Sequence, residues 1–143
     1  MELRNVKPFG AEHLDMVVPE TKLIFSEGGF HAMIKVKNAE GNPYEASGHF
    51  GVFGIKKITP EQAKHFMVNY SYFQPNGGCS MGASPLERIY FMMSGTMTCN
   101  GKNGEKHDLE PGDLLYIGPG EERDMVITGG KPAEVLVILA TKP

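Results

Sequence analysis

Three features that mark particular classes of protein are scarce in this sequence of 143 residues. It has only two cysteines, Cys79 and Cys99, and they stand apart with no Cys-x-x-Cys spacing. Two reduced thiols are therefore expected in place of a disulfide. No apolar stretch approaches the roughly 18 to 20 residues that span a bilayer, and no secretory leader pattern is present. The sequence thus predicts a cytoplasmic, soluble protein with no membrane partner.

Clustered basic charge is the third scarce feature. The formal net charge is −3, and Lys56 and Lys57 are the only adjacent basic residues. Proteins that bind nucleic acids neutralise phosphates with grouped Lys and Arg side chains. No nucleic-acid partner is therefore expected.

Glycine and proline, by contrast, are abundant. The chain has 18 glycines and 10 prolines, spread along its length. Such a distribution disfavours a helical bundle and is typical of many short strands joined by tight turns. A chain of this length can bury one hydrophobic core. We therefore expect a single all-β domain.

Short apolar runs predict strands that follow an extended N-terminal arm. The expected strands cover residues 22–25, 31–37, 49–58, 66–73 and 134–139. Gly51 and Gly54 predict a bulge or a close backbone approach. Thr59-Pro60-Glu61-Gln62 has the pattern of a helix start, with room for one or two turns. Residues 74–85, which contain glycines and serines, are expected to form a loop.

The segment from Glu87 to Arg123 is the most informative. It contains two apolar strands punctuated by Gly95 and Gly112, with a polar hairpin at residues 99–104 between them. The whole chain would have roughly nine or ten strands with frequent turn signals, which favours a barrel or jelly roll over an open sheet.

Residues from about 66 to 140 resemble the conserved barrel of the cupin superfamily. The second cupin motif has two glycines, then a metal-binding His and a closing Asn. Here Gly112 and Gly120 occupy the glycine positions, whereas Arg123 stands where the family has His and Ile127 where it has Asn. Gly118 replaces the proline of that motif.

The first cupin motif ends with a metal-binding Glu, six residues and a Gly. Counting back from Gly95 places Arg88 at the Glu position, and the two His positions fall within residues 81–84, which contain no His. The resemblance implies a jelly-roll barrel in a single domain of residues 1–143. Residues 1–58 would supply the arm and additional strands, and residues 66–140 the barrel.

The two arginines change the expected chemistry. A guanidinium group has five N–H donors and no lone pair to give, so it cannot coordinate a cation. It does suit carboxylates and phosphates through bidentate, charge-assisted hydrogen bonds. If Arg88 and Arg123 point into the barrel, we expect no metal and no other cofactor. The expected ligand is a small carboxylate or enolate bound by these arginines.

Two structural alternatives remain open. A one-residue bulge would turn Glu87 inward, whereas regular alternation places Tyr90 and Met92 on the same face as Arg88. Ion pairs could instead close a degenerate site, because four acidic residues lie near the arginines in the sequence: Glu87, Glu121, Glu122 and Asp124.

The predicted proton-transfer groups are His49, Tyr90 and Glu87. Imidazole titrates near neutral pH, and either His49 or His65 could reach the barrel mouth. The phenol of Tyr90 could donate a proton to an enolate. Met92 and Tyr116 complete the predicted substrate contacts. Cys79 is an alternative thiol nucleophile.

These residues predict a metal-independent protein that binds a small anionic organic molecule. If it is an enzyme, isomerase, lyase or cyclase chemistry is expected in place of dioxygenase chemistry. The alternatives are a non-catalytic sensor or accessory subunit, and a metal enzyme with non-standard ligands such as His49 and His65. Resemblance to small cupins implies a homodimer, to which the N-terminal arm up to about Val36 could contribute a strand.

Overall fold

The computed structural model describes residues 4–6, 16–18 and 33–142 of the chain. Two short strands near the N-terminus, β1 (Arg4–Val6) and β2 (Met16–Val18), pair antiparallel in a separate two-stranded sheet. The expected strand at residues 22–25 and much of the expected N-terminal arm lie outside the described residues. The division into an arm and a barrel therefore stays a prediction.

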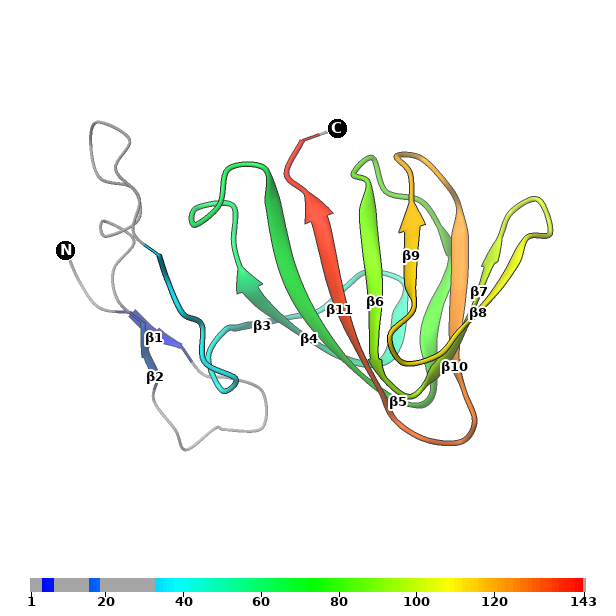
Figure 1. Ribbon diagram of the computed structural model, residues 1–143, viewed down its shortest axis with the longest axis horizontal. Helices are drawn as coiled ribbons and strands as arrows, with labels where there is room; N and C mark the ends of the chain where they lie inside the picture. Colours follow the sequence, from blue (N-terminus) through cyan, green and yellow to red (C-terminus); the bar gives the residue numbers. More distant parts are fainter. Residues whose placement is uncertain (1–3, 7–15, 19–32, 143) are drawn as a thin grey trace.

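Nine further strands form one antiparallel sheet that curls into a jelly-roll barrel (Figure 1). They are β3 (Asn42–Tyr44), β4 (His49–Ile58), β5 (Phe66–Gly82), β6 (Arg88–Ser94), β7 (Thr96–Gly101), β8 (Lys106–Leu109), β9 (Leu114–Ile117), β10 (Arg123–Thr128) and β11 (Ala133–Ala140). The main order is β8-β7-β10-β5-β11-β6-β9, with β4 on the other edge of β5 and β3 beside β4. The predicted all-β jelly-roll fold is confirmed.

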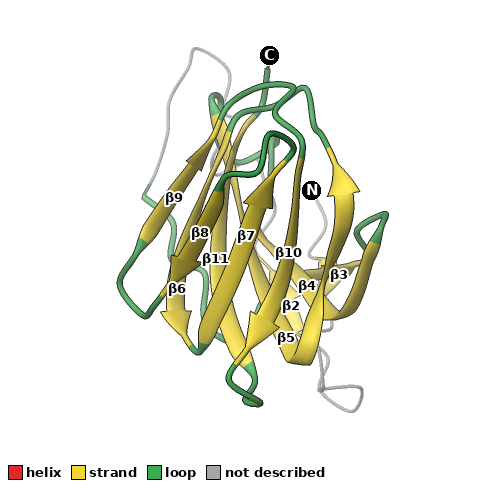
Figure 2. Ribbon diagram, turned by 90° about the vertical axis from the view of Figure 1, so that its right-hand side faces the viewer, coloured by secondary structure: helices red, strands yellow, loops and turns green. Residues whose placement is uncertain are grey.

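The 17-residue strand β5 links the two halves of the barrel (Figure 2). Its first half pairs with β11 and its second half with β10, while β4 pairs along both. The predicted loop at 74–85 is therefore wrong as far as Gly82. A Cβ at Gly78 would overlap the Met125 carbonyl oxygen, and one at Gly77 would overlap Gly51. These glycines allow backbones to approach closely, which the sequence pattern did not distinguish from a loop.

One other expectation needs correction, and the expected helix has its shortest predicted length. The expected strand at residues 31–37 is irregular over its described part, residues 33–37, where no neighbouring strand pairs with it. The helix expected at Thr59 is a single turn. The Gln62 side chain accepts a hydrogen bond from the Thr59 backbone N–H at 3.0 Å, as in a capping box, but strand β5 begins too soon for a helix to continue.

Alternation along β6 sets the interior of the barrel. Arg88, Tyr90 and Met92 are buried, while Ile89 and Phe91 on the opposite face are only partly buried. Arg88 therefore points into the barrel, as regular strand alternation predicts.

Within the part of the chain that the structure describes, no helix meets the length and apolarity that crossing a bilayer requires.

Candidate functional site

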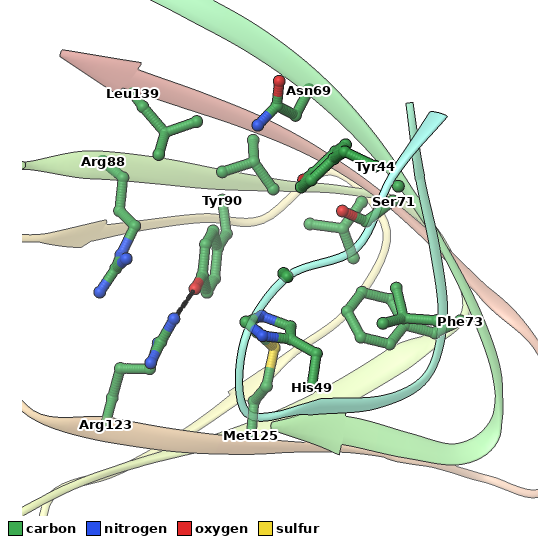
Figure 3. Close-up of a pocket in the computed structure, with 15 residues that line it drawn as sticks. Tyr44, His49, Asn69, Ser71, Phe73, Arg88, Tyr90, Arg123, Met125 and Leu139 are labelled. Atoms are coloured by element: carbon green, nitrogen blue, oxygen red, sulfur yellow. Dashed lines mark hydrogen bonds between the residues drawn. The ribbon is translucent and has the colours of Figure 1, made fainter. Parts of the chain in front are cut away.

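A cavity of about 150 Å³ lies inside the barrel, between β3, β4, β5, β6, β10 and β11 (Figure 3). One side of it carries the polar side chains of His49, Arg88, Tyr90 and Arg123. Most of its remaining lining is apolar and comes from Val52, Phe73, Met125, Val135, Val137 and Leu139. The cavity therefore combines a cationic end with an apolar body, as small-molecule sites commonly do.

Arg123, on β10, is held in place by three hydrogen bonds. Its Nε and Nη2 donate to the phenol oxygen of Tyr90 at 3.0 and 2.9 Å, and its Nη1 donates to the Gly82 carbonyl at 3.1 Å. Its side chain is almost fully buried. None of these acceptors carries a negative charge at neutral pH, so the positive charge of Arg123 is fixed in position without being neutralised.

Arg88, on β6, is the least satisfied polar group of the site. It is 7% exposed, and its Nε and Nη2 are buried with no hydrogen-bond partner. Its guanidinium points toward that of Arg123 in Figure 3. Burial, and to a lesser degree the charge of Arg123, lowers the pKa of Arg88. A buried, unpaired guanidinium costs stability unless an anion or another acceptor compensates it.

The alternative in which ion pairs fill the site is not what the structure shows. Each of the four nearby carboxylates has another partner: Glu87 accepts from Tyr116, Glu121 from the Gly118 N–H, Glu122 pairs with Lys102, and Asp124 accepts from Asn100. Within residues 33–142, no carboxylate forms an ion pair with Arg88 or Arg123. Among the described residues, the charge at this end of the cavity is therefore not neutralised by a carboxylate.

His49, at the start of β4, lines the same cavity. Its Nδ1 lies 2.9 Å from the Ser47 carbonyl oxygen. Because a carbonyl only accepts, Nδ1 carries the proton and Nε2 presents a lone pair. Burial, together with repulsion from Arg123 and Arg88, lowers the pKa of His49. His49 is thus a neutral imidazole that can accept a proton.

Tyr90 supplies a phenol at the centre of the site. Burial raises its pKa despite the two nearby arginines, so it stays protonated at neutral pH. Its oxygen already accepts from two nitrogens of Arg123. The phenol proton is therefore available for donation to a ligand.

The remaining predicted site residues do not line this cavity. Met92 is fully buried in the core beside it. Glu87 and Tyr116 lie on the outside of the barrel, where the phenol donates to the carboxylate at 2.6 Å and Tyr116 is 58% exposed. His65 is exposed and does not reach the cavity. The structure thus brings together His49, Arg88, Tyr90 and Arg123 and leaves Glu87 and Tyr116 outside.

Three polar residues that the sequence analysis missed line the far wall of the cavity. They are Tyr44 on β3 and Asn69 and Ser71 on β5. Asn69, Ser71 and Phe73 share the inward face of β5 and alternate with the less buried Tyr70 and Tyr72. The signal that could have identified Asn69 and Ser71 as cavity residues was their polar character at inward positions of an otherwise apolar strand. Tyr44 lies on β3, and no local sequence pattern indicates that β3 pairs with β4.

The two cysteines are packing residues. Cys79 and Cys99 lie on β5 and β7, opposite Met125 on its two sides, and both are buried and unbridged. Burial raises the pKa of Cys79 and raises that of Cys99 to about 11. A thiol that stays protonated is a poor nucleophile, which argues against the alternative role of Cys79.

The donor set of the cavity does not fit a divalent metal ion. Arg88 and Arg123 have no lone pair to offer, and His49 is the one imidazole that lines the cavity. In the described ranges, no group of three His, Cys, Asp or Glu side chains could hold a metal. A site shared by His49 and His65 also fails, because His65 lies elsewhere.

Comparisons with known proteins agree with the fold. The Cupin domain family matches residues 69–139. No curated protein sequence matches the chain. The polyketide cyclase RemF from Streptomyces resistomycificus is similar with 21% identity and a TM-score of 0.68, over 78% of this chain and 81% of that one.

Two further solved structures are similar. A predicted oxalate decarboxylase from Thermotoga maritima shows 20% identity and a TM-score of 0.65, over 75% of this chain and 98% of that one. KdgF from Halomonas sp. shows 16% identity and a TM-score of 0.62, over 78% and 96% of the two chains. At such identities the likeness shows the fold alone.

Proposed function

The chain belongs to the cupin superfamily, and we propose that its barrel binds a small organic anion, a carboxylate or an enolate, without a metal ion. The observation that carries this proposal is the buried guanidinium of Arg88, whose Nε and Nη2 have no partner. A second fixed cation, Arg123, lies beside it at the position where the family has a metal ligand. An anion between the two would receive charge-assisted hydrogen bonds in a partly desolvated site.

The same geometry supports proton transfer on the bound molecule. His49 Nε2 removes a proton from the carbon next to a carbonyl group, and the electron pair of that C–H bond moves to the carbonyl oxygen. Arg88 and the Tyr90 hydroxyl stabilise the resulting enolate. Return of the proton from His49 to another carbon completes an isomerisation. Cyclisation, decarboxylation and lyase reactions pass through similar enolates.

Binding of an anionic substrate would make His49 a stronger base. In the free protein the arginines weaken His49 as a base, because they repel its protonated form. A bound anion offsets that repulsion, so the imidazole becomes more basic when substrate is present. Two of the similar structures are named a polyketide cyclase and a predicted oxalate decarboxylase, and oxalate is itself a carboxylate.

Non-catalytic binding is the second candidate, as a sensor or an accessory subunit. One observation favours it: Glu87, the one carboxylate among the predicted proton-transfer groups, lies outside the cavity and accepts a hydrogen bond from Tyr116. Only His49 then remains as a base. A site with two anchoring cations and one base suits binding at least as well as turnover.

Proton exchange separates these candidates. The protein is incubated in D₂O with short 2-oxo acids and carboxylates, and loss of the C–H signal next to the carbonyl is followed by NMR, alongside calorimetric titration. Exchange that requires His49, and is lost in His49→Gln while binding persists, supports catalysis. Binding without exchange supports the sensor. Absence of binding to every acid overturns the proposal.

A homodimer is also proposed. It is supported by large apolar side chains on the outer face of the sheet, among which Met93 on β6 and Leu114 on β9 are 44% and 66% exposed. Light scattering of the purified protein tests this, and a monomeric mass would overturn it.

A further inference from the structure

The wall of the cavity opposite the arginines is polar but uncharged. Tyr44, Asn69 and Ser71 face the cavity there, and Asn69 and Ser71 are 8% and 6% exposed. Figure 3 shows Tyr44 and Ser71 on one side of the cavity and the two arginines on the other, with Tyr90 and His49 between them. The two polar ends are joined by apolar side chains such as Val135 and Val137.

The polar groups of these three side chains leave a hydrogen-bonding capacity unused. Burial raises the pKa of Tyr44, an effect that the neighbouring Ser71 and Asn69 only partly offset, so its hydroxyl stays neutral. Asn69 Oδ1 is buried and has no hydrogen-bond partner. A buried amide oxygen without a partner costs stability unless another group donates to it.

The backbone makes room for this group. Tyr44 pairs with Gly54 across β3 and β4, and a Cβ at Gly54 would overlap the Tyr44 ring. The ring therefore lies flat over a glycine and reaches the cavity. Any side chain at residue 54 would displace it, so the position of the phenol is set by the strand pairing itself.

We infer that Tyr44, Asn69 and Ser71 form a second binding point for an uncharged hydroxyl group, so the ligand is a compact hydroxycarboxylic acid. This inference rests on the proposed function, since the acid group occupies the arginine end. A hydroxyl group both donates and accepts hydrogen bonds. It can therefore bond the Asn69 amide whether Oδ1 or Nδ2 of that amide turns toward the ligand. No charged group is needed at this end, because no charged side chain lines it.

The size of the cavity limits the body of the ligand. A cavity of about 150 Å³ is known to hold a molecule as large as benzene, and this cavity has that volume. Its apolar belt suits a short alkyl chain or one ring between the two polar groups. Large sugars and fused polycyclic acids would not fit within it.

Matched pairs of ligands test the inference. Propionate, butyrate, valerate and benzoate are titrated into the protein beside 3-hydroxypropionate, 4-hydroxybutyrate, 5-hydroxyvalerate and 3- and 4-hydroxybenzoate. We expect at least one hydroxylated acid to bind about 5- to 10-fold more tightly than its parent, which is the gain from one neutral hydrogen bond.

Variants then test which residues produce the gain in affinity from the hydroxyl group. Tyr44→Phe keeps the ring and should abolish the preference for the hydroxyl, measured as the ratio of the affinities for the hydroxylated acid and its parent. Ser71→Ala is the second variant, in case Tyr44→Phe does not fold. Tyr72→Phe is the matched control, because Tyr72 is the neighbour of Ser71 on the outer face of β5 and is half-exposed.

The outcomes separate the two proposals. If the parent acids bind and no hydroxylated acid gains affinity, or if the gain survives in both Tyr44→Phe and Ser71→Ala, the second binding point is wrong and the anion site stands. If no acid binds at all, the anion site fails and the second binding point fails with it.

Discussion

Arg123 donates two hydrogen bonds to the phenol oxygen of Tyr90, from Nε at 3.0 Å and from Nη2 at 2.9 Å. Their strands, β10 and β6, are separated in the sheet by β5 and β11, so this pair crosses the barrel interior. The contact fixes a cation beside the cavity without neutralising it. It also fills the acceptor positions of the phenol, which leaves the phenol proton for a ligand.

Removing the Tyr90 hydroxyl should destabilise the protein. In Tyr90→Phe, two N–H groups of a buried guanidinium lose their acceptor, and hydrogen bonds to charged groups contribute about 1.5–3 kcal/mol. We expect the free energy of unfolding, measured with urea, to fall by about that amount. Tyr72→Phe, on the exposed face, should change it by less than about 0.5 kcal/mol. Equal stability of Tyr90→Phe and the wild type would show that the pair contributes nothing.

Arg88→Met should have the opposite effect on stability. The substitution removes a buried charge with unpartnered nitrogens and replaces it with an apolar chain of similar length, so the free energy of unfolding should stay the same or rise. Affinity for small carboxylates should fall by roughly 10- to 100-fold, as expected for one lost charge-assisted hydrogen bond. Lys102→Met, on an exposed lysine, is the control for net charge. A loss of both stability and affinity would indicate a structural role for Arg88.

The resemblance to the two cupin motifs placed Arg88 and Arg123 at positions of metal ligands, but the sequence left open whether Arg88 or Glu87 faces the interior. Strand alternation placed Tyr90 on the same face as Arg88. Glu87 and Tyr116 were misplaced for a physical reason, because a charged or phenolic side chain on a barrel strand is as compatible with the solvent face as with the cavity. The Tyr116 hydroxyl donates a hydrogen bond to the Glu87 carboxylate on the outside of the barrel.

Other features depended on contacts between distant strands. Gly77 and Gly78 suggested a loop in sequence, yet they permit β5 to pass close to β4 and β10. The role of Tyr44 depends on its pairing with Gly54, which no local pattern indicates. Strand alternation predicted which residues share a face, but not which polar groups would meet across the cavity.

His49 should make stability and binding depend on pH. Its pKa in the folded protein is lowered from the usual 6.5, so the unfolded chain binds the proton more readily. Its contribution to stability is therefore fully present above about pH 6.5 and is lost as the pH falls through its lower folded value. Urea unfolding at several pH values should show this slope, and His49→Gln should reduce it. An unchanged slope in the variant would contradict the assignment.

Ligand binding should shift the same titration. An anion beside Arg88 and Arg123 offsets their repulsion of the imidazolium, so the pKa of His49 should rise when a carboxylate is bound. Titration of the imidazole signals by NMR, with and without saturating ligand, measures the shift. His107, on the β8 strand at the surface, serves as the internal control. A fall in the pKa of His49 would place the anion somewhere else.

The two thiols should be unreactive in the native protein. Both are buried, and the pKa of Cys99 is about 11, so little thiolate forms at pH 8. Reaction with a disulfide reagent such as DTNB should be slow in buffer and should reach two thiols per chain in denaturant. Rapid labelling of one native cysteine would restore the nucleophile hypothesis for Cys79.

The central claim is that Arg88 and Arg123 bind an organic anion directly. Calorimetric titration of the wild-type protein with small carboxylates, before and after removal of metal ions by a chelator, tests it most directly. We predict one carboxylate bound per chain with the same affinity in both samples. Binding that disappears with the chelator and returns with added Mn²⁺, Fe²⁺ or Zn²⁺ would contradict it.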